Sequence, residues 1–183
     1  MLYFAAHQDV QERVRSEIRA VVGDTRLPSL ADRTLLPYTT AACHEIQRCA
    51  NIVAVNFVIF RRTTVDTSVQ DKRIPAGTMV YGDLHQILAT DPHFEQPEQF
   101  RPERYLTEDR KTLRKDLLDR TIPFGVGRRQ CAGEGLARVE LFLGVAATLQ
   151  RYRILPPVDG AGVDLSPRLL NFHLPRPHLL QLE

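Results

Sequence analysis

The chain has 183 residues, of which 43% are hydrophobic and 25% are charged, as is usual for a globular domain with its own core. The 24 basic and 22 acidic residues nearly balance, so the net charge of +2 gives no electrostatic reason to expect a nucleic-acid partner. Three cysteines, an odd and small number, argue against a disulfide framework. The longest apolar run, at 141–149, is far shorter than the roughly 20 residues of a membrane span, so no anchor is expected in this chain.

The first elements along the chain are expected to be helices. Apolar residues recur at helical spacing across residues 9–22, which predicts an amphipathic helix. Asp9 and Glu12 resemble a capping box at its start, and Gly23 stands where such a helix would stop. A second helix with a weaker apolar pattern is expected over residues 39–50.

The middle of the chain changes to β-type composition and then to turns. Residues 52–60 are apolar on both faces, which predicts a buried strand. A hairpin is expected at 65–73, a short strand at 78–81 and a short helix at 82–90. Prolines punctuate residues 91–105, which are too apolar for a flexible linker and are interpreted as an ordered meander.

The last third contains a loop rich in glycine and arginine, at 124–131, followed by a predicted helix from about 132 to 151 with one apolar stripe. The tail that begins at residue 152 is rich in proline. Only short strands and turns are expected there.

The loop carries the strongest motif of the sequence. Residues 124–133, FGVGRRQCAG, fit the pattern F-x-x-G-x-R-x-C-x-G. A cysteine that ligates a metal must be ionised, and neighbouring cations and a helix N-terminus stabilise its negative charge. Glycines let the backbone turn tightly against a flat ligand. A phosphate-binding loop or a buried structural cysteine are the alternatives, but the match at every specified position favours a haem ligand. These positions are Phe124, Gly127, Arg129, Cys131 and Gly133.

The loop resembles the haem-binding signature of the cytochrome P-450 superfamily. With its neighbours, as PFGVGRRQCAGEGLARVELFL, it is similar to the microsomal drug- and lipid-oxidising branch of animals. The resemblance implies a mainly α fold with small β-sheets. It implies that residues 1–183 form a single partial domain, the C-terminal haem-binding portion, with the N-terminal part absent. It also implies the cofactor heme b (iron protoporphyrin IX) with Cys131 as axial ligand of its iron.

A second motif is Glu45-Ile-Gln-Arg48, whose charged residues share one face of a helix at i and i+3. Such pairs are common on solvated helices and mean little alone. The sequence Pro102-Glu103-Arg104-Tyr105 resembles the family's meander motif, except that Tyr105 stands where phenylalanine is usual. By this resemblance, Glu45, Arg48 and Arg104 form a structural charge cluster that folds the cysteine pocket.

Other expectations concern the haem edge and the substrate. The resemblance implies that Arg61 and Arg129 reach haem propionates, because a guanidinium pairs well with a carboxylate. A solvated strand end is an equal alternative for Arg61. Residues 51–58 and 169–172 resemble two substrate-contacting segments, although both could simply be core.

The function implied by the resemblance is that of a haem-thiolate monooxygenase, which inserts one oxygen atom from O2 into a lipophilic organic substrate. An NADPH-dependent reductase would supply electrons, and a complete relative would lie at the cytoplasmic face of the endoplasmic reticulum membrane. Apart from Cys131, no catalytic residue is assigned. The alternative is a truncated, non-catalytic haem-binding or inactive fragment. A zinc domain built on Cys43, His44 and Cys49 lacks the second ligand pair that such sites show.

Overall fold

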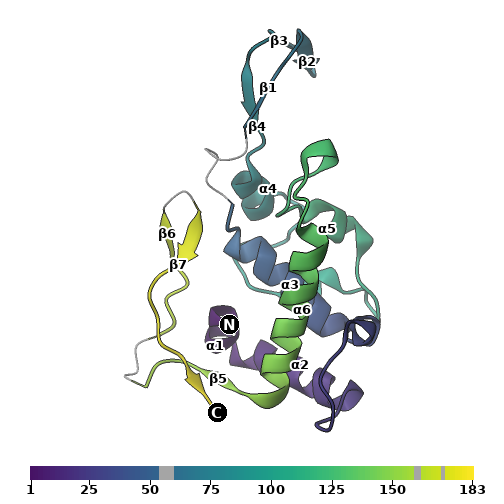
Figure 1. Cartoon of the computed structure of the whole chain (residues 1–183), viewed down its shortest axis with the longest axis vertical. Coiled ribbons are helices and arrows are strands. Elements are labelled where there is room, and N and C mark those ends of the chain that lie inside the picture. Colours follow the sequence, from purple (N-terminus) through teal and green to yellow (C-terminus); the bar gives the residue numbers. More distant parts are fainter. Residues whose placement is uncertain (54–59, 159–161, 170–171) are drawn as a thin grey trace.

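The structure is a computed structural model that describes residues 1–53, 60–158, 162–169 and 172–183. Helices form its body, and small antiparallel sheets lie around them in the described part of the chain (Figure 1). This arrangement confirms the expected mainly α class with small β-sheets. The helices are α1 (Leu2–Ala6), α2 (Gln8–Val21), α3 (Pro37–Ala50), α4 (Leu84–Thr90), α5 (Lys115–Arg120) and α6 (Glu134–Arg151), with 3-10 turns η1 (Leu30–Leu35), η2 (Pro102–Tyr105) and η3 (Gly127–Arg129).

Helix α3 lies at the centre of the body and packs against α2, α6, α4 and η2 (Figure 1). Val14 and Ile18 of α2 and Phe142 and Leu149 of α6 are buried in the same apolar cluster. Each such side chain contributes about 1.5–3 kcal/mol when fully buried, so the stripes predicted from spacing account for how the helices associate.

Buried polar side chains join the ends of these helices. Arg15 Nη1 on α2 donates to the carbonyl of Leu149 near the end of α6, at 2.7 Å. Gln150 Nε2 donates to the carbonyls of Gly23 and Arg26, both at 2.7 Å. These bonds satisfy carbonyls at or just beyond helix ends, and they fix α2 and α6 side by side.

The helix beginnings differ from the sequence predictions. The capping box proposed for Asp9 and Glu12 is wrong, because α2 begins at Gln8 and no side chain caps it, which leaves Asp9 inside the first turn. Helix α6 begins at Glu134 instead of near residue 132, since the first helical bond runs from the amide of Ala137 to the carbonyl of Gly133, at 2.9 Å. The stop predicted at Gly23 is confirmed by its φ of +73° just after α2.

The described strands are short and pair antiparallel. The hairpin predicted over 65–73 is present, but the bend expected at 71–73 lies at 70–71, because Lys72 and Arg73 belong to the second strand and a positive φ at Gln70 turns the chain. Residues 54–59 of the buried strand predicted at 52–60 lie outside the described residues. At its described ends the prediction is wrong, because residues 52–53 form a turn and Ile52 and Phe60 are exposed. The pairs are β1 (Phe60–Arg62) with β4 (Met79–Tyr81), β2 (Thr67–Val69) with β3 (Lys72–Ile74), β5 (Ile154–Leu155) with β8 (Gln181–Leu182), and β6 (Pro167–Leu169) with β7 (His173–Pro175).

The meander predicted for residues 91–105 is ordered, as expected. Its prolines exclude long elements, yet Phe94, Phe100 and Tyr105 are buried in the core, so burial of aromatic rings holds the turns in place. Among the residues that the structure describes, no helix combines the length and the apolar character needed to cross a membrane.

Candidate functional site

The loop that carries Cys131 folds back on itself just before α6. The amide of Cys131 donates to the carbonyl of Phe124 at 2.9 Å, and the amide of Gln130 donates to the carbonyl of Gly127 at 3.1 Å. Gly125 and Gly127 have φ values of +74° and +75°, which residues with a Cβ rarely adopt. The tight closure of the loop therefore depends on these two glycines.

Of the three cysteines, only Cys131 is exposed. Burial raises the pKa of the thiols of Cys43 and Cys49 to about 12, so both are neutral near pH 7. No His, Cys, Asp or Glu cluster that could hold a metal ion occurs among the described residues. Cys131 is therefore the cysteine whose sulfur an external group can reach.

The sequence had suggested that Cys131 directly precedes the first residue of the helix. In the structure Cys131 lies three residues before α6, which begins at Glu134. The amide of Glu134 donates to the carbonyl of Cys131 at 3.3 Å, which forms a turn that leads into the helix. A Cβ placed on Gly133 would lie 3.8 Å from the sulfur, an ordinary van der Waals contact, so Gly133 is a direct neighbour of the sulfur. Val126 and Leu136, each 65% exposed, leave apolar surface on both sides of the cysteine along the chain.

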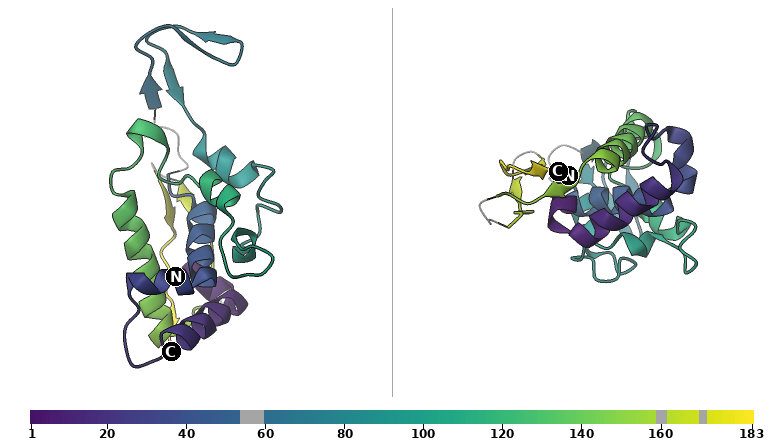
Figure 2. Two further views of the ribbon diagram at one scale, coloured as in Figure 1. Left: turned by 90° about the vertical axis from the view of Figure 1, so that its right-hand side faces the viewer. Right: turned by 90° about the horizontal axis from the view of Figure 1, so that it is seen from below.

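Arg61 is brought against this loop from β1. Its Nη2 donates to the carbonyl of Arg129 at 3.3 Å, and the loop lies beside the β1–β4 ribbon (Figure 2). Both arginines are exposed, and no ion pair within the described part of the chain involves either guanidinium. The structure thus places Arg61 against the backbone of Arg129, two residues before the exposed Cys131, and both guanidinium groups lack a carboxylate partner among the described residues.

These groups suit an iron porphyrin. A thiolate is one of the axial ligands that haem iron takes, and guanidinium groups pair with propionate carboxylates. Gly133 lies beside the sulfur, and Leu136 offers exposed apolar surface in the first turn of α6. The chain therefore carries a donor set for the thiolate side of a haem.

Phe124 is half-buried, and its ring faces the guanidinium of Arg138 with a centroid distance of 5.2 Å. Sequence reasoning missed Arg138. The i,i+4 pair Glu134–Arg138 on the predicted helix was the signal available, and the structure contains it at 2.8 Å.

Glu45, Arg48 and Arg104 come together as a buried ion cluster between α3 and the meander. Glu45 accepts from Arg48 Nε at 2.8 Å and from Arg104 Nε at 3.0 Å, and it also accepts from the amide of Arg101 at 2.9 Å. The three charged side chains are 0%, 1% and 2% exposed. In Arg48, burial alone would lower the pKa, but hydrogen bonds to Glu45 and its charge outweigh burial and raise it.

The remaining donors of the cluster also have partners. Arg48 Nη1 donates to the carbonyl of Leu88 on α4 at 2.9 Å, and Arg104 Nη2 donates to the carbonyl of Gln99 at 3.1 Å. Tyr105, the departure from the meander motif, is fully buried, and its hydroxyl lies 2.7 Å from Thr121 Oγ1. Thr121 therefore gives the extra hydroxyl the partner that a buried polar group needs.

One backbone hydrogen bond joins the first segment that resembles a substrate-contacting region, 51–58, to the residue just after the second, 169–172. The amide of His173 on β7 donates to the carbonyl of Ile52 at 2.8 Å, just after α3 ends at a left-handed Asn51. Residues 54–59 and 170–171, which hold most of these segments, lie outside the described residues.

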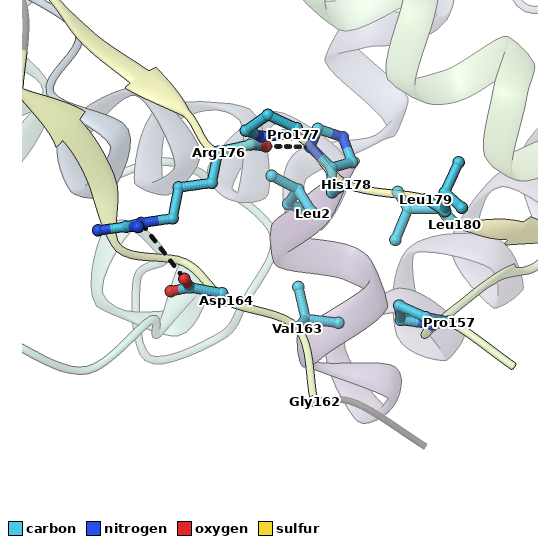
Figure 3. A pocket seen from close by; sticks show the side chains of 10 residues that line it. All are labelled: Leu2, Pro157, Gly162, Val163, Asp164, Arg176, Pro177, His178, Leu179 and Leu180. Carbon is cyan, nitrogen blue, oxygen red and sulfur yellow. Dashed lines mark hydrogen bonds and ion pairs between the residues drawn. The ribbon is translucent and has the colours of Figure 1, made fainter. Parts of the chain in front are cut away.

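A hollow of about 500 Å³ lies between α1 and the C-terminal segments (Figure 3). Leu2, Val163 and Leu179 give it apolar walls, and an ion pair of 3.4 Å joins Asp164 to Arg176. No residue of the Cys131 loop lines it, so this hollow is separate from the candidate haem site.

Comparison with known proteins places this site in context. Residues 1–179 match the family model described as Cytochrome P-450. Cytochrome P-450 2E1 of Sus scrofa is 38% identical over 178 residues, which cover 97% of this chain and 35% of that protein. Cytochrome P-450 2H2 of Gallus gallus is 40% identical over 179 residues, 97% of this chain and 35% of that protein. Cytochrome P-450 2F2 of Mus musculus is 39% identical over 180 residues, 98% of this chain and 36% of that protein.

The chain thus spans about a third of the length of the curated relatives that it matches, while almost all of its own length is matched.

Proposed function

Because the chain belongs to the cytochrome P-450 family, we propose that it is the haem-ligating portion of a haem-thiolate monooxygenase, with Cys131 as the axial ligand of the iron. The observation that carries this proposal is the exposed Cys131 thiol, on a loop that is closed by two positive-φ glycines, includes the exposed Arg129 and is contacted by Arg61. We further propose that residues 1–183 are a single partial domain, corresponding to the C-terminal portion of a complete protein.

Each residue of the site has a proposed task. Cys131 holds the iron through its sulfur, while Arg61 and Arg129 bind the propionates and so orient the cofactor. Gly127 and Gly133 allow its close approach, and Phe124 shields the loop from water. The cluster of Glu45, Arg48 and Arg104 is structural, because its hydrogen-bond partners lie within the body of the fold and its side chains are closed to solvent.

The cofactor proposed is haem b. When bound, it would supply the chemistry that places one atom of O2 in a lipophilic substrate and reduces the other to water. The proposed enzyme class is an oxidoreductase acting on paired donors with reduction of molecular oxygen. An NADPH-dependent reductase would be its partner, at the cytoplasmic face of the endoplasmic reticulum membrane for the complete protein.

The second candidate is a haem-binding fragment without catalysis. It rests on the fact that this chain spans about a third of the length of the relatives it matches.

Isotope labelling separates the two. The haem-loaded protein is supplied with a reductase, NADPH, a lipophilic probe and ¹⁸O-labelled O2. The monooxygenase proposal expects one labelled atom per product molecule, and expects none from a Cys131→Ala protein. A wild-type protein with thiolate-bound haem and no labelled product, although the probe binds and the iron is reduced, would support the non-catalytic candidate.

A further inference from the structure

Arg138 lies in the second turn of α6, and its guanidinium links α6 to α3. Nε donates to Glu134 Oε1 in the same helix at 2.8 Å. Nη1 lies 3.3 Å from His44 Nδ1 and donates to Gln47 Oε1 at 3.2 Å, both on α3. The side chain is only 20% exposed although it carries a charge. These partners fix the guanidinium in one place, whereas a solvated arginine would sample many rotamers.

The same guanidinium packs on the Cys131 loop. It lies over the Phe124 ring at 5.2 Å, within the range of a cation–π contact. The carbonyl of Phe124 is the acceptor for the amide of Cys131, at 2.9 Å. Arg138 therefore supports the residue that closes the loop around the cysteine.

His44 is suited to hold this arginine. It is buried, and burial, followed by the charges of Arg138 and Arg33, lowers its pKa to about 3. The imidazole is thus neutral near pH 7 and has one acceptor nitrogen. Because Nδ1 faces an N–H donor, Nδ1 is assigned as the acceptor and Nε2 as the protonated nitrogen.

Position in the sequence connects this contact to the buried ion cluster. His44 directly precedes Glu45, and its ring lies 5.7 Å from that of Tyr105 in η2. One turn of α3 therefore fixes the meander through Glu45 and reaches α6 through His44 and Gln47.

We propose that Arg138, held by His44 and Gln47, is a positioning residue that sets the Phe124 carbonyl and so the direction in which Cys131 presents its sulfur. The inference deepens the proposed function and rests on it only for the effect on bound haem. Its effect on the loop is independent of any ligand.

Hydrogen exchange at the Cys131 amide tests the effect on the loop directly. Arg138→Met keeps the aliphatic stem and removes the charge and its donors, and Arg151→Met, at an exposed position at the end of the same helix, is the matched control. In Arg138→Met the amide is expected to exchange about tenfold faster than in wild type, the effect of losing one such contact. Arg151→Met should exchange as wild type does.

Two variants of His44 test the specific contact. His44→Gln retains an acceptor for Arg138, whereas His44→Phe retains the ring shape and leaves the donor unpaired. The amide of Cys131 should exchange as slowly as in wild type in His44→Gln, and faster than in wild type in His44→Phe. In haem-loaded protein, Arg138→Met and His44→Phe should lose the thiolate-type carbon monoxide spectrum about tenfold faster than wild type, and His44→Gln should not.

Wild-type protection of the Cys131 amide in folded Arg138→Met and His44→Phe would overturn the inference. If Arg138→Met does not fold, the two His44 variants test the inference. Equal exchange rates of the Cys131 amide in His44→Gln and His44→Phe would then also overturn it. A wild-type protein without a thiolate-type spectrum would contradict the proposed function instead, while the exchange rates would still decide whether Arg138 positions the loop.

Discussion

The buried ion cluster on α3 and the Cys131 loop are both rich in charged residues, but the charges are neutralised within the cluster and not within the loop. In the cluster, Glu45 neutralises Arg48 and Arg104, and backbone carbonyls take further donors. At the loop, Arg61 and Arg129 are exposed and have no carboxylate partner among the described residues. The charges of the cluster are therefore balanced within the fold. The loop, in contrast, has two arginines that could bind an external anion and a thiol that could bind a metal.

This difference separates a structural role from a binding role. Removing one member of a closed buried network leaves an uncompensated charge and lowers stability. Removing an exposed arginine leaves the fold intact and weakens only what binds to it. The two regions should therefore respond to mutation in different measurements.

The largest expected effect is on stability. Glu45→Ala should lower the free energy of unfolding by about 3–5 kcal/mol, because two buried guanidinium groups lose their counter-charge. Chemical denaturation with circular dichroism measures this. The matched control is Asp119→Ala, which removes the exposed pair with Lys115 and should leave stability unchanged within error. Equal losses in the two variants would contradict the closed-network interpretation.

A second effect on stability depends on pH. The folded-state pKa of His44, about 3, lies below its unfolded value, so its neutral form is fully favoured above about pH 6.5. As the pH falls below that value, the unfolded chain takes up the proton first, and stability should drop by roughly 1.4 kcal/mol per pH unit down to about pH 3. The groups that face His44 are Arg138 on α6, Arg33 in η1 and Tyr105 in η2.

His44→Gln isolates this effect because glutamine does not titrate. Relative to wild type, it should gain about 2 kcal/mol in stability between pH 6.5 and pH 5. A constant difference between the two proteins across that range would show that His44 is not buried as a neutral group.

A smaller effect is expected at the open region. Arg61→Ala should weaken haem binding about tenfold, since one charge-assisted pair with a propionate is lost, and should not change the unfolding midpoint of the protein without haem. Haem titration followed by absorbance measures the affinity. Arg62→Ala, the exposed neighbour on β1, serves as the control. If both variants bind haem as tightly as wild type, Arg61 is a solvated strand end.

Part of this contrast could be predicted from local patterns, and the third member of the cluster, Arg104, only from the resemblance of its motif to the family's meander. The spacing of Glu45 and Arg48 fixes them on one helix face, and the glycines around Cys131 specify a tight loop. The acceptors at Leu88 and Gln99 could not be predicted, since their carbonyls face Arg48 and Arg104 only after the meander has folded.

Two other features escaped prediction for related reasons. Helix α6 starts late because Gly133 serves as its N-terminal flanking residue, and a motif does not reveal backbone angles. The bridge from Arg138 to His44 and Gln47 joins residues that are more than 90 positions apart in sequence. The spacing of Glu134 and Arg138 indicates only a contact within one helix, so it gives no sign of the contacts that Arg138 makes with α3.

The most direct test of the central proposal is the reduced, carbon monoxide difference spectrum of the haem-loaded protein. Ligation by Cys131 predicts the red-shifted Soret band typical of a thiolate in wild type and in Cys49→Ser, and its loss in Cys131→Ala. A thiolate-type band that persists in Cys131→Ala, or a wild-type spectrum typical of a neutral ligand, would contradict the assignment of Cys131 as the iron ligand.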